Sequence, residues 1–136
     1  MFTENEPVVI SNEDVVITAC PTLVEENLAK QEFVWGYYFT IENNSSEKIH
    51  LLGKNWNITD GKGNRYCDDS DGFKGEIPAL EPGEMFEFTS VAPLSSPSAV
   101  FYGSCKIKKE SNGQTKEIKI PTFEMSVSLP QSTCLN

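Results

Sequence analysis

The sequence predicts an all-β domain built as an antiparallel β-sandwich of seven or eight strands. Runs of β-forming residues are punctuated by turn residues about every ten positions, which is the spacing of a sandwich. No long helical pattern and no parallel β-α-β unit interrupts these runs. Thirty-eight per cent of the 136 residues are hydrophobic, with eight Phe, four Tyr and two Trp, which is enough for one core. Packing of the immunoglobulin or fibronectin type III kind suits this pattern.

The first half of the chain predicts an edge piece, a first strand and a central strand. A strand from Val15 to Ala19 follows the candidate edge piece at Val8 to Ile10. The segment from Leu23 to Gln31 has the best helical pattern, but it is short and follows Pro21, so we expect a strand end and a loop there. From Phe33 to Glu42, large side chains recur at every second position and should line one face. These side chains are Phe33, Trp35, Tyr37, Phe39 and Ile41.

The next strand, from Ile49 to Thr59, leads into a hairpin. Its apolar side chains Leu52, Trp56 and Ile58 are expected on one face. Asp60 to Asn64 contains two glycines, which supply the positive φ values of a tight turn. The chain from Asn64 to Cys67 should therefore return antiparallel to this strand.

The second half of the chain predicts the remaining strands. Pro82 and Gly83 suit the centre of a type II turn, because proline presets φ and glycine accepts a positive φ. One domain is expected over residues 1–129, followed by a flexible tail at 130–136. The later strands are expected at Met85 to Thr89, Val100 to Lys108, Thr115 to Ile120 and Phe123 to Leu129.

The charge balance limits the classes of partner. Twenty acidic and eleven basic residues give a net charge of −9, and Arg65 is the single arginine. A phosphate-backbone binder needs clustered Lys and Arg, so we expect no nucleic-acid partner. No apolar run approaches the ~20 residues of a membrane span, and the acidic first residues do not resemble a signal peptide. We therefore expect a cytoplasmic protein without a membrane partner.

Cysteine and histidine usage argues against a metal centre and against catalysis. Cys20, Cys67, Cys105 and Cys134 are widely separated, so we expect buried or half-buried thiols and no zinc site. His50 is the single histidine and lies within a predicted strand. No nucleophile signature accompanies it, so we expect no catalytic residue and no cofactor. Trp35 and Trp56 are interpreted as core anchors, although an aromatic groove for a peptide uses the same residue types.

Several segments together resemble the ApaG family. They are Tyr38 to Asn43, Trp56 to Asp60 with its glycine turn, Gly72 to Pro78, Leu80 to Glu84, and Ile120 to Phe123. The resemblance extends from about Asp14 to Val127, and the order and spacing of the segments make it specific. It implies a fibronectin-like β-sandwich with no established catalytic activity. Bacterial members are associated with magnesium and cobalt handling and are often encoded near a diadenosine tetraphosphatase, and eukaryotic relatives are domains of F-box and polymerase-interacting proteins.

The same resemblance singles out one loop. Family members commonly carry a G-x-G-x-x-G loop for which pyrophosphate binding has been suggested; here Ser70 replaces the first glycine, whereas Gly72 and Gly75 remain. The family's usual arginine before the tryptophan motif corresponds to Lys54. A phosphate-binding loop of a dinucleotide enzyme opens a helix, but this loop continues into Glu76, Ile77 and Pro78. A structural turn is therefore the favoured interpretation. The candidate ligand or partner residues are Ser70, Gly72, Lys74, Gly75 and Glu76.

Three aspartates next to this loop form the alternative candidate site. Asp68, Asp69 and Asp71 offer oxygen ligands of the kind that hard cations prefer. An EF-hand register would place Cys67 and Pro78 at ligand positions, and neither residue suits that role. We expect a solvated acidic loop and keep a weak cation site as the alternative.

The sequence therefore predicts a non-catalytic binding module. We expect a protein partner, bound at a sheet edge or through the loops from Asp68 to Pro78, and a chain that is a monomer or a weak homo-oligomer. The alternative is a protein that binds a nucleotide, a pyrophosphate or a divalent cation through residues 68–78. An enzyme acting on a pyrophosphate bond is the least supported class.

Overall fold

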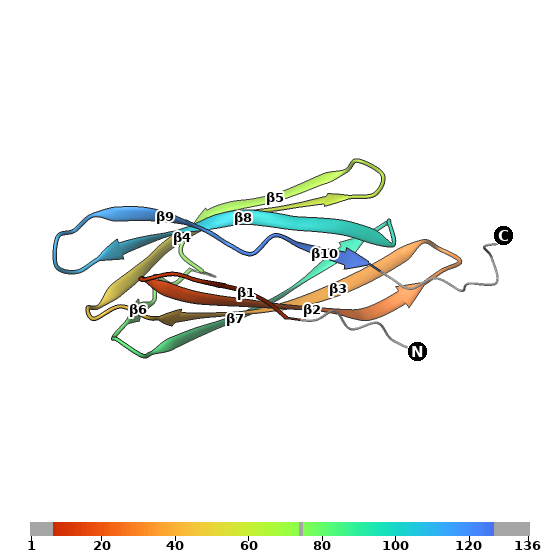
Figure 1. Cartoon of the computed structure of the whole chain (residues 1–136). Helices are drawn as coiled ribbons and strands as arrows, with labels where there is room; N and C mark the ends of the chain where they lie inside the picture. The colour runs from red at the N-terminus through yellow and green to blue at the C-terminus, as the bar shows by residue number, and fades with distance from the viewer. Residues whose placement is uncertain (1–6, 74, 127–136) are drawn as a thin grey trace.

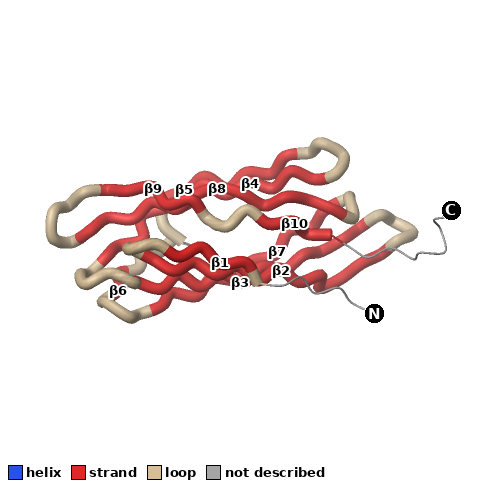
Figure 2. Tube along the Cα trace, viewed as in Figure 1, coloured by secondary structure: helices blue, strands red, loops and turns tan. Residues whose placement is uncertain are grey.

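The computed structural model describes residues 7–73 and 75–126, and these residues form β-strands joined by turns (Figures 1 and 2). The described residues contain no helix, and hence none long and apolar enough to cross a membrane. The strands are β1 (Val8–Ser11), β2 (Val15–Asn27), β3 (Glu32–Asn43), β4 (Ile49–Asp60), β5 (Arg65–Asp71), β6 (Ala79–Leu80), β7 (Met85–Leu94), β8 (Ser98–Lys109), β9 (Thr115–Lys119) and β10 (Phe123–Ser126).

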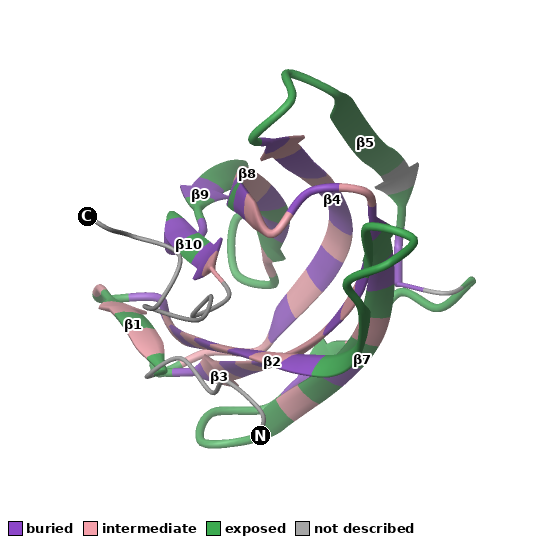
Figure 3. Cartoon of the chain, turned by 90° about the vertical axis from the view of Figure 1, so that its right-hand side faces the viewer, coloured by how far each residue is buried: buried purple, intermediate pink, exposed green. Residues whose placement is uncertain are grey.

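Two antiparallel sheets face each other and form the predicted sandwich. The four-stranded sheet has the order β1-β2-β3-β7. The six-stranded sheet has the order β10-β8-β4-β5, with β6 paired to β4 and β9 paired to β8. Seen along the strands, β5 and β7 lie on one side of the sandwich, and β1 and β10 lie on the other (Figure 3). β5 and β7, the outermost strands on the first side, border two surface hollows.

Strand alternation builds the core between the sheets. β3 lies between β2 and β7, and its alternate large side chains face the other sheet. Trp35 and Phe39 are completely buried, and Tyr37 is half-buried. From the other sheet, Trp56 stacks on Phe39 with ring centroids 4.6 Å apart. Each buried aromatic side chain stabilises the fold by about 1.5–3 kcal/mol, so these rings hold the sheets together.

The structure confirms the antiparallel sandwich and changes the predicted strand lengths. Ten strands are present in the described residues instead of seven or eight, because short pieces such as β6 join the margins of the sheets. β2 continues through Pro21 to Asn27, where the sequence predicted an end at Ala19. The described pairing of β1 with β2 ends at Ala19, so Pro21 lies beyond that ladder and its missing N–H is tolerated. The predicted tail at 130–136 lies outside the described residues.

One predicted face in β4 is wrong. The sequence placed Leu52 on the same face as Trp56 and Ile58, but Leu51 is fully buried and Leu52 is half-buried. A β-bulge between Leu51 and Gly53 causes the difference, because one extra residue reverses the alternation.

An ion-pair cluster joins the two sheets on the side opposite β5 and β7. We call it the Asp14 clasp. The buried carboxylate of Asp14, at the start of β2, lies 2.8 Å from Nζ of Lys109 and 2.6 Å from Nζ of Lys116. Burial alone would raise the pKa of Asp14, but hydrogen bonds from both lysines and their charges outweigh burial and hold the pKa below 3.8. The clasp therefore ties β2 to the β8–β9 hairpin.

Charge is divided unequally between the sheets. The strands of the four-stranded sheet contain no Lys or Arg, and they carry Glu25, Glu26, Glu32, Glu42 and Glu87. The β8–β9 pair carries Lys106, Lys108, Lys109, Lys116 and Lys119. A basic surface is thus confined to one sheet.

The described thiols differ in exposure. Cys105 is buried, and burial raises its pKa to about 12. Cys20 is half-buried, whereas Cys67 is exposed, contrary to the expectation of buried or half-buried thiols. Cys67 is exposed because β5 is an outermost strand. Cys134 lies outside the described residues.

Candidate functional site

The glycine-containing loop after β5 is a tight hairpin. The Phe73 amide donates to the carbonyl oxygen of Glu76 at 2.7 Å, and the Glu76 amide donates to Phe73 at 3.1 Å. Gly72 and Gly75 have φ values of +71° and +86°, which glycine adopts without strain. A Cβ atom at Gly72 would lie 2.4 Å from the Glu76 oxygen, whereas a Cβ at Gly75 would meet nothing within 4 Å. The backbone of the hairpin thus requires a glycine at Gly72.

This hairpin uses the amides that an anion site would need. The Gly72 amide donates to the carbonyl oxygen of Leu52 at 2.6 Å and anchors the loop to β4. With the amides of Phe73 and Glu76 also engaged, three donors near the loop are directed at backbone oxygens. A phosphate cradle depends on free backbone amides, so this arrangement favours the structural interpretation of the loop.

The five candidate loop residues are only partly described. Ser70 pairs with Lys54 in the β4–β5 ladder, and its side chain is outside the description. Lys74 lies outside the described residues. Gly75 and Glu76 are exposed at the turn, whereas Gly72 is buried. Of the three residues whose burial is described, Gly75 and Glu76 are therefore accessible.

Strand alternation separates the three aspartates. Asp68 is opposite Trp56 in the ladder, on the inward face, and its Oδ2 lies 3.6 Å from Nζ of Lys54. Asp69 and Asp71 line the outer face of the sheet. Among residues 7–73 and 75–126, no three His, Cys, Asp or Glu side chains are grouped closely enough to hold a metal ion. The geometry thus gives no support to a cation site made from all three carboxylates.

Lys54 forms a cluster that the sequence did not reveal. Its side chain is 4% exposed, and Nζ donates to the carbonyl oxygen of Gly72 at 3.3 Å. Nζ also lies 5.1 Å from the ring centroid of Phe73, 5.3 Å from that of Phe88 and 5.8 Å from that of Trp56. Aromatic faces attract a cation, and the carboxylate and carbonyl complete its surroundings. The ammonium therefore fastens the hairpin to the aromatic core.

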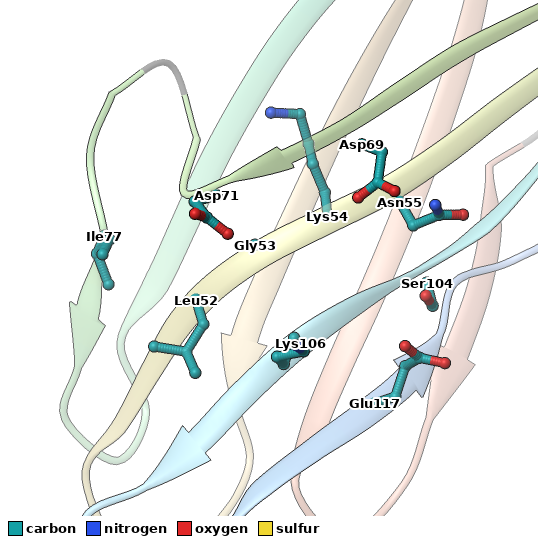
Figure 4. A pocket seen from close by; sticks show the side chains of 10 residues that line it. All are labelled: Leu52, Gly53, Lys54, Asn55, Asp69, Asp71, Ile77, Ser104, Lys106 and Glu117. Carbon is teal, nitrogen blue, oxygen red and sulfur yellow. The ribbon is translucent and has the colours of Figure 1, made fainter.

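A broad hollow lies on the outer face of the six-stranded sheet (Figure 4). Its volume is about 660 Å³. Asp69 and Asn55 lie side by side on β5 and β4, and Lys106 and Glu117 are opposite each other on β8 and β9. Its lining mixes acidic, basic and amide groups, so it has the composition of a polar surface.

His50 pairs with a carboxylate at the margin of the fold. Its Nε2 lies 2.9 Å from Oε2 of Glu110, beyond the end of β8. The hydrogen bond with His50 lowers the pKa of Glu110. The pair joins β4 to the β8–β9 turn.

Two adjoining hollows occupy the side between β5 and β7. The first, of about 270 Å³, is lined mainly by apolar residues that include Tyr37, Trp56 and Phe101. The second, of about 670 Å³, is lined by Phe33 and by Glu25, Glu26 and Glu32. Tyr66, Pro93 and Leu94 line both hollows, so the two are adjacent. We call the combined feature the β5–β7 groove.

The aromatic part of the groove carries two perturbed polar groups. Burial raises the pKa of Tyr37, and a hydrogen bond with Ser90 opposes that rise. The indole N–H of Trp56 has no hydrogen-bond partner within the described part of the chain. A buried donor without an acceptor costs about 1–3 kcal/mol, which neighbouring aromatic faces offset in part. The sequence suggested an aromatic groove only as an alternative to core anchoring; Trp56 is 2% exposed, packs in the core and also borders this hollow.

Comparison with known proteins gives consistent results. A family profile described as ApaG domain matches residues 24–109. Protein ApaG of Brucella canis is 37% identical over 115 residues, covering 83% of this chain and 88% of the relative. Protein ApaG of Mesorhizobium japonicum is 37% identical over 99 residues, covering 73% and 75% of the two chains.

A solved structure has the same fold. It is the crystal structure described as the "Putative ApaA Protein from Bordetella pertussis", with a TM-score of 0.79 and 30% sequence identity. The similarity covers 83% of this chain and 93% of the other. The sheets described above thus have a counterpart of nearly the same extent in that protein.

Proposed function

Because this chain belongs to the ApaG domain family, we propose that it is a non-catalytic, cytoplasmic binding module whose partner is a protein. The partner binds at β5 and β7, which are edge strands of the two sheets, or at the neighbouring loops from Asp68 to Pro78. The ApaG family is associated with magnesium and cobalt homeostasis, and this chain would contribute to that process only through its protein partner.

The β5–β7 groove is the observation that carries the proposal. It exposes apolar surface between two outermost strands, and Tyr66, which lines both hollows, is 38% exposed. Apolar surface that borders a sheet edge and is rimmed by polar groups is typical of a protein-binding site. The core beneath it consists of buried, contacting aromatic rings, so the site would be preformed.

The placement of reactive groups supports a non-catalytic role. His50, the single histidine, is paired with Glu110 at the margin of the fold. Cys105 is buried, and its raised pKa of about 12 keeps the thiol protonated at neutral pH. Neither residue is placed next to a substrate-sized apolar hollow with a partner base.

Binding of a small ligand by residues 68–78 is the alternative, and it has less support. Three loop amides already donate to backbone oxygens, and the aspartates are divided between two faces. A nucleotide or a divalent cation would therefore require the hairpin to rearrange.

Affinity capture followed by reconstitution tests the proposal. The folded chain is used as bait in extract from its native host, and each captured protein is purified and titrated against the chain by calorimetry. The expected result is a saturable complex of defined stoichiometry. Turnover of diadenosine tetraphosphate by the pure chain, or calorimetric binding of nucleotide or cobalt at micromolar concentration without any protein partner, would contradict it.

A further inference from the structure

We propose that the β5–β7 groove binds an extended peptide segment that carries one aromatic or large aliphatic side chain and one basic side chain. This inference rests on the proposed protein-binding function and names the partner chemistry. The apolar side chain enters the hollow next to Tyr37 and Tyr66, and the basic side chain lies among Glu25, Glu26 and Glu32.

Charge complementarity selects a basic partner. Glu25, Glu26 and Glu32 line the larger hollow, and the residues that line the two hollows include no Lys, Arg or His. Asp68, in the smaller hollow, is already paired with Lys54 and is not counted. All the strands of the four-stranded sheet lack basic residues as well. A cation placed among the three exposed glutamates is attracted by several carboxylates at once, and salt should weaken this attraction.

The apolar end of the groove supplies the second anchor. Phe101 and Trp56 form its inner wall, and ring centroids 5.7 Å apart hold them in an edge-on arrangement. A volume of about 270 Å³ suits a single large side chain rather than a whole ligand of drug size. Aromatic anchors in such pockets commonly dominate the affinity of protein interfaces.

The spacing of the two anchors follows from the strands. Tyr37 lines the apolar hollow and Phe33, four positions earlier on β3, lines the acidic one. At the rise of an extended chain, the two hollows are separated by roughly 13 Å. A peptide would bridge them with the aromatic and basic side chains about four residues apart, on the same face of the peptide.

Pro93 indicates how the peptide is held. It lies on β7 between the two hollows and has no backbone N–H to offer a new strand. A continuous backbone ladder along β7 is therefore interrupted at this point. Affinity must come mainly from the two side-chain anchors, and it should depend on both.

A second copy of this chain fits the groove less well. Its exposed lysines are concentrated on the β8–β9 hairpin, but the turn from Glu110 to Gln114 contains no apolar side chain that could serve as the aromatic anchor. A net charge of −9 on each copy also opposes association.

Synthetic heptapeptides test the proposal. The probe contains phenylalanine and arginine four residues apart, in both orders, and the control peptides carry glutamate in place of arginine or serine in place of phenylalanine. Binding to the full chain is measured by calorimetry at low salt, and amide chemical-shift changes locate it. The expected result is saturable binding, with shifts in β3, β7 and β5, that is lost with either control peptide.

Matched variants test the acidic part and the apolar part of the groove separately. The triple change Glu25→Gln, Glu26→Gln and Glu32→Gln should weaken the arginine peptide about tenfold, and it should leave a peptide with glutamine in place of arginine unaffected. A triple change of Glu13, Glu117 and Glu124 to Gln alters the net charge equally, and it should have little effect. Tyr66→Ser should also weaken binding about tenfold, because Tyr66 lines both hollows, whereas Val91→Ser, at an exposed valine on the outer face of β7, should not.

Three outcomes would overturn the proposal, and they are separable from failure of the proposed function. These are equal binding of the arginine and glutamate peptides, no binding of any peptide at millimolar concentration, and shifts confined to the outer face of the six-stranded sheet. If a reconstituted native partner still binds both the triple glutamine variant and Tyr66→Ser, the chain is a binding module and the groove is not its site. If no native partner binds at all, the proposed function itself fails.

Discussion

Lys54 shows how one residue can serve as a structural cation. Its stem packs among the aromatic rings, and its ammonium reaches both the carbonyl oxygen of Gly72 and the carboxylate of Asp68. Asp68 is about half exposed, with 54% of its side chain accessible, so water weakens the charge–charge contribution of the pair. Most of the stabilisation should therefore come from packing, the carbonyl and the aromatic faces.

Substituting Lys54 separates these contributions. We expect Lys54→Ala to lower the free energy of unfolding by about 2–4 kcal/mol, because it removes the packed stem and leaves a cavity. Lys54→Met keeps most of the volume and adds contacts between sulfur and the rings, so it should cost about 1 kcal/mol or less. Urea unfolding monitored by tryptophan fluorescence measures both. Equal losses for the two variants would mean that the charge itself dominates.

Sequence alternation alone could not place Lys54. In the sequence, Lys54 is notable only as the counterpart of a family arginine, and the bulge between Leu51 and Gly53 shifts the alternation of β4. Burial of a lysine becomes intelligible only when Phe73 and Phe88, which are distant in sequence, are seen around it. Contacts of this kind are set by tertiary packing, which local patterns do not encode.

At the scale of elements, the hairpin after β5 was predicted correctly as a turn. Its glycines and the absence of a following helix indicated that much. The reason for Gly72 in particular is a close approach to the Glu76 carbonyl, which depends on how the turn folds back. The three aspartates illustrate the opposite case, because their adjacency in sequence suggested one site and the strand sends them to opposite faces.

Alanine at the two loop glycines should have unequal effects. Gly72→Ala places Cβ against the Glu76 oxygen at 2.4 Å in a backbone with φ +71°, so we expect a loss of about 2–4 kcal/mol. Gly75→Ala meets open space and has only the strain of φ +86°, so about 1 kcal/mol is expected. Thermal and urea unfolding of the pair give the comparison. A larger loss at Gly75 than at Gly72 would contradict the described hairpin.

The Asp14 clasp should make stability depend on pH at both extremes. The folded pKa of Asp14 lies below 3.8, so its contribution is fully present above about pH 4 and is lost as the pH falls through the folded pKa. The hydrogen bonds that Lys109 and Lys116 donate to Asp14 raise the pKa values of both lysines above 10.5. Their contribution is present below that pH and is lost as the pH rises through the raised values.

Asp14→Asn tests the clasp. We expect it to lower the free energy of unfolding by about 1–3 kcal/mol at pH 7 and to flatten the decline of stability between pH 4 and pH 2. Urea unfolding at a series of pH values provides the measurement, with Glu25→Gln as a control at an exposed carboxylate near the other end of β2. An unchanged pH profile in Asp14→Asn would exclude the clasp as a stabilising contact.

At the scale of the whole molecule, the alkylation rate of the Cys105 thiol measures how often the whole fold unfolds. It is 1% exposed, and its pKa is raised to about 12, whereas Cys67 is exposed at an outermost strand. At pH 8, iodoacetamide should modify Cys67 readily and Cys105 only through global unfolding, because the reactive thiolate is both rare and inaccessible. Peptide mass spectrometry resolves the two rates, which should become similar in concentrated urea. Fast labelling of Cys105 in native buffer would mean that β8 opens locally.

The sandwich itself was predictable because its signals are local: alternation in β3, turn chemistry at Gly83, and the lack of a helical pattern. The β5–β7 groove was not, since it arises where Tyr66 of one sheet meets Pro93 and Leu94 of the other. The sequence offered an aromatic groove only as an alternative use of Trp35 and Trp56. Which of the two tryptophans borders a hollow depends on the pairing order of the sheets.

The unequal division of charge between the sheets has a kinetic consequence. One sheet without lysine or arginine and a lysine-bearing β8–β9 hairpin on the other give the molecule an electric dipole in addition to its net charge of −9. A positively charged molecule diffusing nearby would experience a torque that turns it toward the glutamate-bearing surface before contact. Encounters would therefore be faster in dilute buffer than in concentrated salt, even if the lifetime of the complex stayed the same.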